Sequence, residues 1–236
     1  MSQTAKTSRE IEEQRPEPDE TLAPVGRIVA ATFSVALVVI SAMWALAVPR
    51  RLGLAFYTEQ FVCVILGLAL AVAFLRLPAD RTTVRRHVPW FDWIAAAVGL
   101  GIGAYMAIYY PDLVNFLLMR PASIVIPGAL LIVLLLEATR RATGYALVTI
   151  VIVFLLYGVL GNYVPGQLSG RAQDWDRLTS YLTFDLNGIL GVPLTVSATI
   201  VVAFVFFGNL LSATGGARFF TDLALLCTGR FRRGAM

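Results

Sequence analysis

Three ionisable residues at the end of a long apolar run are the clearest candidates for chemistry in this sequence. Glu137 is followed three and four positions later by Arg140 and Arg141, and residues at these spacings lie on one face of a helix. Such ion pairs stabilise an exposed helix by only about 0.2 to 0.5 kcal/mol each. We therefore interpret the cluster as a structural anchor that stops a membrane helix and fixes its depth, in preference to a contact with substrate.

Three polar side chains inside a later apolar run are weaker candidates for binding a substrate or an ion. Ser197, Thr199 and Asn209 carry hydroxyl or amide oxygens, and oxygen atoms are the ligands of hard cations such as sodium. Helix packing is the competing interpretation, because Ser and Thr on membrane helices usually hydrogen-bond to their own preceding turn or to a neighbouring helix. For Asn209, the alternative is a place at the cytoplasmic interface.

Ionisable side chains are absent from the predicted apolar cores of the chain. We take these cores to hold no Asp, Glu, Lys, Arg or His, whereas proton relays and voltage sensors require such groups inside the bilayer. His87 is the one histidine, so a His-Glu-x-x-His metal site is excluded. Cys63 and Cys227 lack metal-ligand spacing and are interpreted as buried thiols. We expect no enzyme activity, metal or cofactor, and a lipid-modifying enzyme would need clustered catalytic residues that the sequence does not show.

Composition indicates the class of protein. Of the 236 residues, 58% are hydrophobic and 14% are charged, whereas soluble globular proteins carry about 25% charged residues. The basic residues are scattered between apolar runs and form no continuous stripe, which argues against a nucleic-acid partner. We predict an all-α integral membrane protein embedded in the lipid bilayer.

About six transmembrane helices are expected, because six apolar runs approach the roughly 30 Å of hydrocarbon at about 1.5 Å per residue. Gly191 and Pro193 are expected to open the last helix, since a proline near a helix start costs no hydrogen bond. Gly99 and Gly103 lie four positions apart in the third run and permit close helix packing. The runs cover residues 28–48, 61–75, 90–111, 122–136, 145–160 and 192–211.

The distribution of Lys and Arg predicts how these helices are oriented. With the amino terminus inside, the inner segments hold 14 basic residues and the outer segments hold 5, so both termini are expected in the cytoplasm. Residues 1–26 are acidic and contain prolines, and we interpret them as a disordered tail. The outer segment 161–190 mixes polar and aromatic residues, which indicates a folded loop or a short interfacial helix.

Several short motifs occur together in the second half of the chain. They include Glu137-Ala138-Thr139-Arg140-Arg141, Gly191-Val192-Pro193-Leu194 and Phe206-Phe207-Gly208. With them, the chain from about Gly26 onward resembles the fused permeases of tripartite ATP-independent periplasmic (TRAP) transporters, in the branch paired with TAXI-type binding proteins. The first and second motifs are fairly specific together and weak apart.

This resemblance implies a sodium-coupled importer of organic acids, C4-dicarboxylate-like or related carboxylates, in the bacterial inner membrane. A periplasmic TAXI-type binding protein would deliver the substrate, and sodium would be the coupling ion. Residues 27–141 would form a four-helix domain like the small permease subunit, and residues 142–236 would form the first helices of the large transporter domain.

The sequence departs from the family pattern because it stops at Met236. The hairpins that form the sodium and substrate sites in the family would lie beyond this position, so we expect an amino-terminal fragment whose partner is the remainder of the large permease domain. The alternative function is a non-transporting membrane scaffold that packs against a larger permease.

Overall fold

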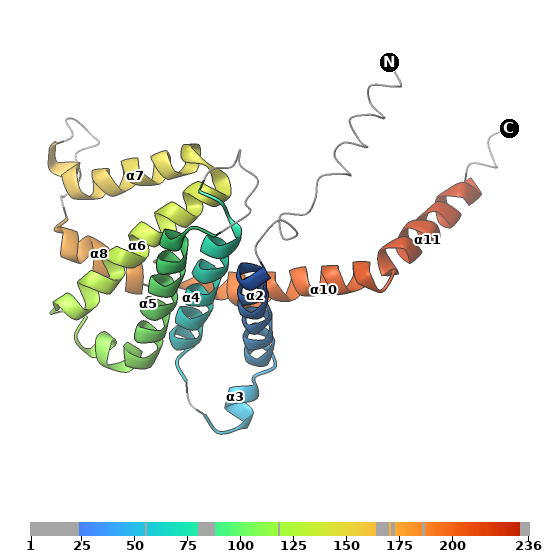
Figure 1. The fold of residues 1–236 in the computed structure, drawn as a ribbon, viewed down its shortest axis with the longest axis horizontal. Coiled ribbons are helices and arrows are strands. Elements are labelled where there is room, and N and C mark those ends of the chain that lie inside the picture. Colours follow the sequence, from blue (N-terminus) through green and yellow to red (C-terminus); the bar gives the residue numbers. More distant parts are fainter. Residues whose placement is uncertain are drawn as a thin grey trace, which may run out of the picture.

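The computed structural model is built of helices and has no strand in the part of the chain that it describes (Figure 1). It describes residues 24–54, 56–79, 88–117, 119–163, 170, 173–185 and 187–231. The longer helices are α2 (Pro24–Ala45), α4 (Thr58–Arg76), α5 (Trp90–Asn115), α6 (Ala122–Thr143), α7 (Tyr145–Leu160), α8 (Trp175–Phe184), α10 (Val202–Ala213) and α11 (Gly216–Phe231). The short ones are α3 (Val48–Arg51), the 3-10 helix η1 (Gly161–Tyr163), α9 (Val192–Val196) and the π-helical segment η3 (Ser197–Val201).

Six helical stretches are long and apolar enough to cross a membrane, which confirms the predicted fold class. They are 25–45, 58–76, 90–115, 122–143, 145–163 and 192–213, each of 19 to 26 residues. The last stretch is continuous through α9, η3 and α10. The segment after residue 163 contains the short helix α8, as its mixed composition predicted.

Some helix boundaries differ from the sequence-based prediction. Helix α2 begins at Pro24, and residues 1–23, most of the expected tail, lie outside the described part. Helix α6 continues seven residues past the predicted end at Leu136, since its charged residues find partners inside the bundle. The expected domain boundary after Arg141 therefore falls within the last turn of α6.

Helix α4 lies at the centre of the packing, between α2 and α5 (Figure 1). Glycines bring α4 and α5 close together: a Cβ on Gly103 would lie 2.7 Å from the Cys63 carbonyl oxygen and 2.8 Å from the Gly67 Cα. In the same way, a Cβ on Gly99 would lie 3.1 Å from the Leu70 Cβ. The close packing expected from Gly99 and Gly103 is therefore confirmed. Between membrane helices, such van der Waals contact replaces the hydrophobic effect as the source of attraction.

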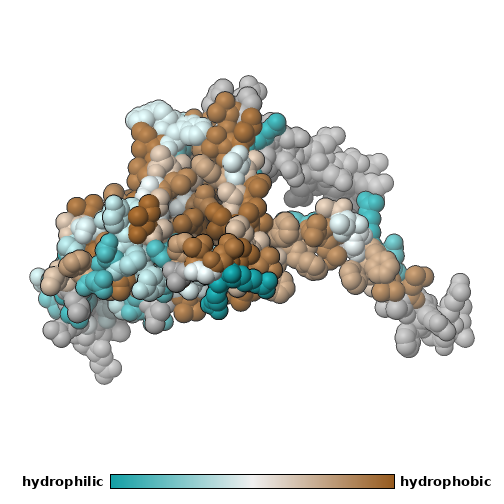
Figure 2. Space-filling model, turned by 90° about the horizontal axis from the view of Figure 1, so that it is seen from below, coloured by the Kyte–Doolittle hydropathy of each residue, from teal (hydrophilic) through white to brown (hydrophobic). Residues whose placement is uncertain are grey.

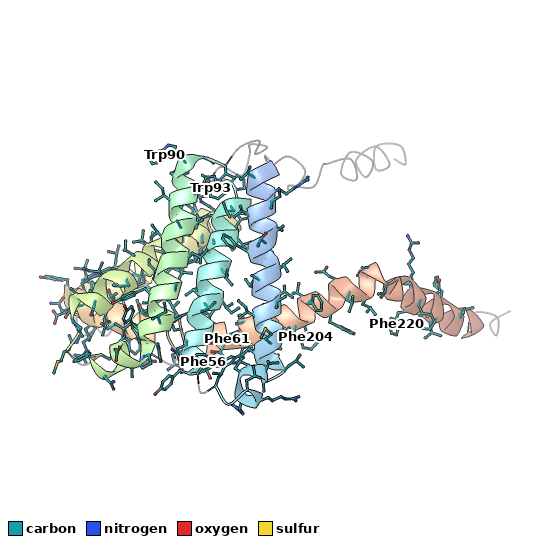
Figure 3. All side chains as sticks on the ribbon, turned by 60° about the horizontal axis from the view of Figure 1, so that its bottom comes forward. Phe56, Phe61, Trp90, Trp93, Phe204 and Phe220 are labelled. Atoms are coloured by element: carbon teal, nitrogen blue, oxygen red, sulfur yellow. The ribbon has the colours of Figure 1, made fainter. Side chains whose placement is uncertain are left out.

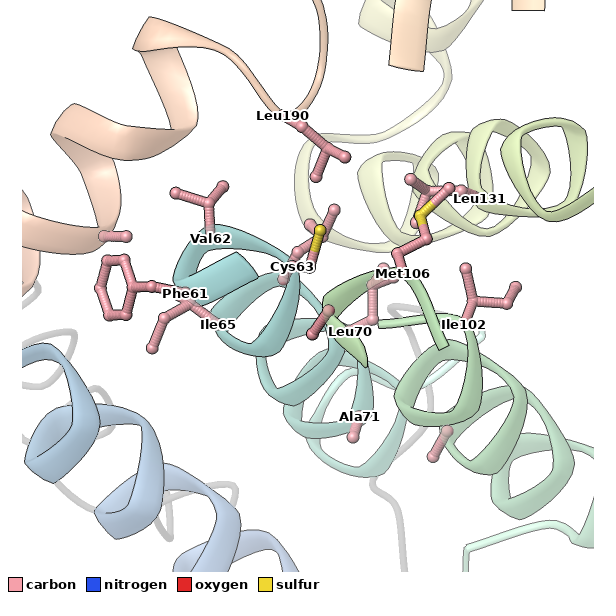
Figure 4. Close-up of a cluster of buried hydrophobic side chains, with 14 of the residues drawn as sticks. Phe61, Val62, Cys63, Ile65, Leu70, Ala71, Ile102, Met106, Leu131 and Leu190 are labelled. Carbon is pink, nitrogen blue, oxygen red and sulfur yellow. The ribbon is translucent and has the colours of Figure 1, made fainter. Parts of the chain in front are cut away.

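The hydrophobic core draws on distant parts of the sequence (Figure 4). Phe61 of α4 stacks on Trp44 of α2, with ring centroids 4.5 Å apart. Leu190 and Ala198, which flank α9, are buried in the same cluster as α4 and α5. The parts of the chain assigned by sequence to two domains thus share one core.

Two prolines inside helices have their lost hydrogen bonds replaced by neighbouring side chains. A proline in a helix leaves the carbonyl four residues earlier without its usual donor. Pro111 leaves the Ala107 carbonyl free, and the Gln60 side chain of α4 donates to it at 2.8 Å. Pro127 leaves the Ser123 carbonyl free, and the Tyr105 hydroxyl donates to it at 3.4 Å. Helix α5 therefore continues through Pro111 to Asn115, four residues past the predicted end of the third run.

Aromatic side chains lie at both ends of the bundle formed by α2, α4 and α5, as expected for anchors at a membrane interface. Figure 3 shows Trp90 and Trp93 at one end of α5 and Phe56 at the opposite end of the bundle. Tyr57 and Tyr110 pair at this second end, with ring centroids 5.8 Å apart. By contrast, α7 lies beside α6 at a steep angle to α4 and α5, and α10 and α11 extend away from the bundle past α2 (Figure 1). These three helices expose many large hydrophobic side chains, and Figure 2 shows apolar surface along the arm that extends from the bundle. In the membrane this surface must be covered by lipid or protein.

The orientation of the helices stays a prediction, which cysteine labelling tests. In a background without Cys63 and Cys227, we expect single cysteines at positions 81–86 to react with an impermeant maleimide only after the cells are opened. Cysteines at the exposed positions 174, 177 and 181 should react in intact cells, because the basic residues hold the first segment inside. Labelling with the opposite pattern would contradict the prediction that both termini lie in the cytoplasm.

Candidate functional site

The charged cluster predicted from sequence has a fourth member, Asp92. Arg141 is 4% exposed and Asp92 is fully buried, and the Arg141 Nη1 lies 2.7 Å from the Asp92 Oδ1. The Arg141 Nε also donates to Glu137 Oε1 at 2.8 Å. Arg140 binds the same carboxylate through two nitrogens, each at 2.7 Å. The four side chains form a connected ionic network, called here the α5–α6 network.

Backbone and aromatic groups complete this network. The Arg141 guanidinium lies over the Phe74 ring at 4.9 Å from its centroid and donates to the Leu77 carbonyl at 3.3 Å. Arg140 donates to the Ala79 carbonyl at 3.3 Å and to the Tyr145 hydroxyl at 3.1 Å. The network therefore joins the ends of α4 and α6 to the beginnings of α5 and α7.

The position of Asp92 corrects two sequence-based expectations. The third apolar run was taken to lack ionisable residues, but α5 begins at Trp90 and carries Asp92 in its first turn. The pairs of Arg141 were taken to be exposed and weak, whereas a buried ion pair faces a desolvation cost of several kcal/mol per ion that its partner must offset. The sequence places Asp92 between two tryptophans, Trp90 and Trp93, which was the one local hint of its position at the membrane interface. No sequence spacing links Asp92 to Arg141, 49 positions later.

The charges of the network cancel. Two carboxylates face two guanidinium groups, so no net positive charge remains to attract an organic anion. Binding a carboxylate substrate would require one of the existing pairs to break. This arrangement favours an anchoring role for Glu137, Arg140 and Arg141 over substrate contact, and that role stays a prediction.

Both hydroxyl candidates lie on η3 and bond back to carbonyls of the preceding turn on α9. Ser197 donates to the Pro193 carbonyl at 2.9 Å, and Thr199 donates to the Thr195 carbonyl at 2.7 Å. Ser197 is exposed and Thr199 is half-buried. Gly191 immediately precedes α9, and Pro193 lies in its first turn.

The three binding candidates do not converge on one point. Asn209 is exposed on α10, and its distance of twelve positions from Ser197 corresponds to about 18 Å along a helix. Ser197 and Thr199 differ by two positions, which do not face each other on a helix. Among the described residues, no group of three or more His, Cys, Asp or Glu side chains is placed to hold a metal ion.

The π-helical turn at Ser197–Val201 is a feature that sequence reasoning missed. Single π-turns inside helices are rare and often occur at functional sites. Here the turn interrupts the regular hydrogen bonding of the sixth membrane-length helix beside the hydroxyl candidates. No residue type in this segment predicts a π-helical turn.

Helix α8 packs on α6 through two fully buried threonines. A Cβ on Gly128 would lie 2.9 Å from the Thr183 Oγ1 and 2.9 Å from the Thr179 Cγ2. Both threonine hydroxyls are buried without a hydrogen-bond partner among the described residues. An unsatisfied buried donor costs about 1 to 3 kcal/mol.

Replacing Thr179 by valine should therefore raise the free energy of unfolding by about 1 kcal/mol, because valine keeps the shape and removes the buried hydroxyl. Thermal unfolding in detergent measures this change. Ser180→Ala is the control in the same helix, since the Ser180 hydroxyl already donates to the Asp176 carbonyl at 2.8 Å; it should lower stability by about 0.5 to 1 kcal/mol. A loss of stability in Thr179→Val would show that its hydroxyl has a partner.

Comparison with known proteins gives one finding. Residues 130–236 match the family model of the tripartite ATP-independent periplasmic transporter, DctM component. No curated protein and no solved structure matches the chain. The matched part begins inside α6 and includes Glu137, Arg140 and Arg141 of the network, but not Asp92. The family is one of transporters and not of enzymes, and together with the six membrane-length helices it identifies the chain as a multi-pass protein of the inner membrane whose residues 130–236 are similar to a TRAP transporter permease.

Proposed function

We propose that this chain is a membrane permease component of a TRAP transporter that imports organic acids with a sodium gradient. The observation that carries the proposal is the match of residues 130–236 to the DctM component, over a segment that contains two complete membrane-length helices and part of a third. The motifs around Arg141 and Pro193 lie within this segment.

The finer features of this function rest on the resemblance seen in the sequence. C4-dicarboxylates or related carboxylates would be the solutes, sodium would be the coupling ion, and a periplasmic TAXI-type binding protein would deliver the solute. In this arrangement α2, α4, α5 and α6 form the small permease-like domain, while α7 and the α9–α10 helix open the large transporter domain.

The ion and substrate sites are proposed to lie mainly in sequence that follows Met236. The separation of Ser197 and Asn209 along the helix supports this, as does the internal pairing of the α5–α6 network. The π-helical turn near Ser197 would contribute at most one wall of such a site.

An uptake experiment tests the proposed function. The chain is expressed with its binding protein, once alone and once with the coding sequence that follows codon 236, and accumulation of a labelled dicarboxylate is measured. We expect uptake only from the longer form, and only with an inward sodium gradient. Uptake by the short chain alone would contradict our account of where the site lies, and sodium-independent uptake would contradict the coupling ion.

A non-transporting scaffold is the second candidate. It is favoured by the cancelled charges of the α5–α6 network and by hydroxyls that bond within their own helix. Purification from the membrane should then yield the chain together with a larger multi-spanning protein, which transports equally well when this chain is removed. Loss of transport on removal would favour the first proposal.

A further inference from the structure

The turn between α2 and α4 forms a cavity at one end of the bundle. Its volume is about 500 Å³, and Trp44, Arg50, Leu54, Phe56 and Thr58 are among its lining residues. The lining thus combines polar residues, Arg50 and Thr58, with aromatic and aliphatic ones.

The backbone of this turn is shaped by two left-handed residues. Ala47 has φ 53° and Gly53 has φ 74°, and between them α3 makes a single turn of helix. The Leu54 N–H donates to the Pro49 carbonyl at 3.0 Å, and the Gly53 N–H donates to the Arg50 carbonyl at 3.2 Å. These bonds fix the backbone at Arg50. Arg50 and Arg51 are both exposed, but Arg50 lines the cavity and Arg51 is not among its lining residues.

The depth of the turn follows from the helices that it joins. Helices α2 and α4 are both long and apolar enough to cross the bilayer, so the end of one and the start of the next lie at the same membrane surface. Phe56 marks this end of the bundle, opposite Trp90 and Trp93 (Figure 3). The turn therefore meets the layer of lipid headgroups.

The exposed side chains of the turn suit this layer. Leu52, Leu54 and Phe56 are at least half exposed, which is unfavourable in water and favourable among acyl chains. Arg50 and Arg51 are the charged residues between Ala45 and Tyr57, giving the turn a charge of +2. The nearest acid in sequence, Glu59, is not among the cavity's lining residues.

We propose that this cavity binds the phosphate group of a membrane phospholipid. Arginine forms short, charge-assisted hydrogen bonds with phosphate oxygens, and Arg50 supplies them here with the Thr58 hydroxyl as a second donor. Trp44, Leu54 and Phe56 contact the glycerol and the upper part of an acyl chain. The inference depends on membrane insertion of α2 and α4 and is independent of the transported solute.

Lipid retention by the purified full chain tests this site. The protein is delipidated in detergent, phosphatidylglycerol is added back, and native mass spectrometry counts the bound lipid. Arg50→Gln should weaken retention about ten-fold, since one charge-assisted contact is lost. Arg51→Gln is the matched control and should change retention less than about two-fold, although it removes the same charge at the same depth.

Three further measurements make the result decisive. Thr58→Val, which preserves shape, should weaken retention several-fold and serves as the test if Arg50→Gln does not fold. Diacylglycerol, which lacks the phosphate, should not be retained, and inorganic phosphate should not displace the lipid. Equal losses in Arg50→Gln and Arg51→Gln would show diffuse attraction to the membrane surface and overturn the site, as would retention of diacylglycerol or unchanged binding by Thr58→Val.

Discussion

Asp92→Ala should lower the free energy of unfolding by about 3 kcal/mol, because it leaves Arg141 buried without its closest partner. Breaking one side of a buried ion pair costs about 3 to 5 kcal/mol. The lower end of this range applies here, since Arg141 keeps its hydrogen bonds to Glu137 and to the Leu77 carbonyl. The change is measured by thermal or detergent-induced unfolding in micelles.

A double-mutant cycle separates the pair itself from other effects of the substitutions. Arg141→Met alone should cost a similar amount, because it removes the guanidinium that pairs with Asp92 in a site with no solvent exposure. The double variant Asp92→Ala, Arg141→Met should lose much less than the sum of the two, as neither charge is then left alone. Additive losses would contradict a coupled pair.

The exposed pair of Arg120 and Asp176 provides the control for this experiment. These side chains are 33% and 46% exposed, and their nitrogen and oxygen atoms are 3.4 Å apart. Arg120→Gln should therefore change stability by less than about 1 kcal/mol. A comparable loss at both pairs would show that burial is not what makes the α5–α6 network important.

Gly103→Ala should lower stability by about 2 to 3 kcal/mol by separating α4 from α5. Its new Cβ would overlap the Cys63 carbonyl oxygen and the Gly67 Cα, at 2.7 and 2.8 Å. Both are backbone atoms of α4, so no side chain can rotate away and the helices themselves must shift. Overpacking of this kind costs about 1 to 3 kcal/mol.

Gly101 is the matched control for Gly103, two positions away in the same helix. A Cβ there would meet nothing within 4 Å, so Gly101→Ala should be neutral or stabilising by up to about 1 kcal/mol through better helix propensity. Unfolding of both variants in the same detergent tests the pair. Equal effects at the two positions would contradict the close approach of α4 and α5.

Which segments form membrane-length helices was largely predictable, because this depends on local composition. An uncharged run of about 20 residues has few alternatives to a membrane helix, since each backbone polar group must be bonded within the segment. The bounds of α7 match the prediction for 145–160. Helix ends were less predictable where charges are involved: α6 passes through Arg141 because Asp92 and Glu137 compensate that charge.

Convergence of side chains was less predictable, because it depends on which helix faces meet. The spacing of Glu137, Arg140 and Arg141 indicated a local cluster, and these residues do share partners. The role of Gln60 at the carbonyl freed by Pro111 has no local signature, since the two residues come from different helices. The same holds for the buried threonines of α8 against Gly128.

The sequence by itself thus determined an all-helical membrane protein, its six membrane-length segments and its likeness to TRAP permeases, because hydrophobic length and short motifs act within one stretch of chain. Only the tertiary structure decided that Asp92 completes the charge network and that Arg50, unlike Arg51, lines a cavity at the membrane surface. Such pairings depend on the rotation and register of packed helices. These are set by shape-matched contacts between distant residues such as Gly67 and Gly103, which no single segment encodes.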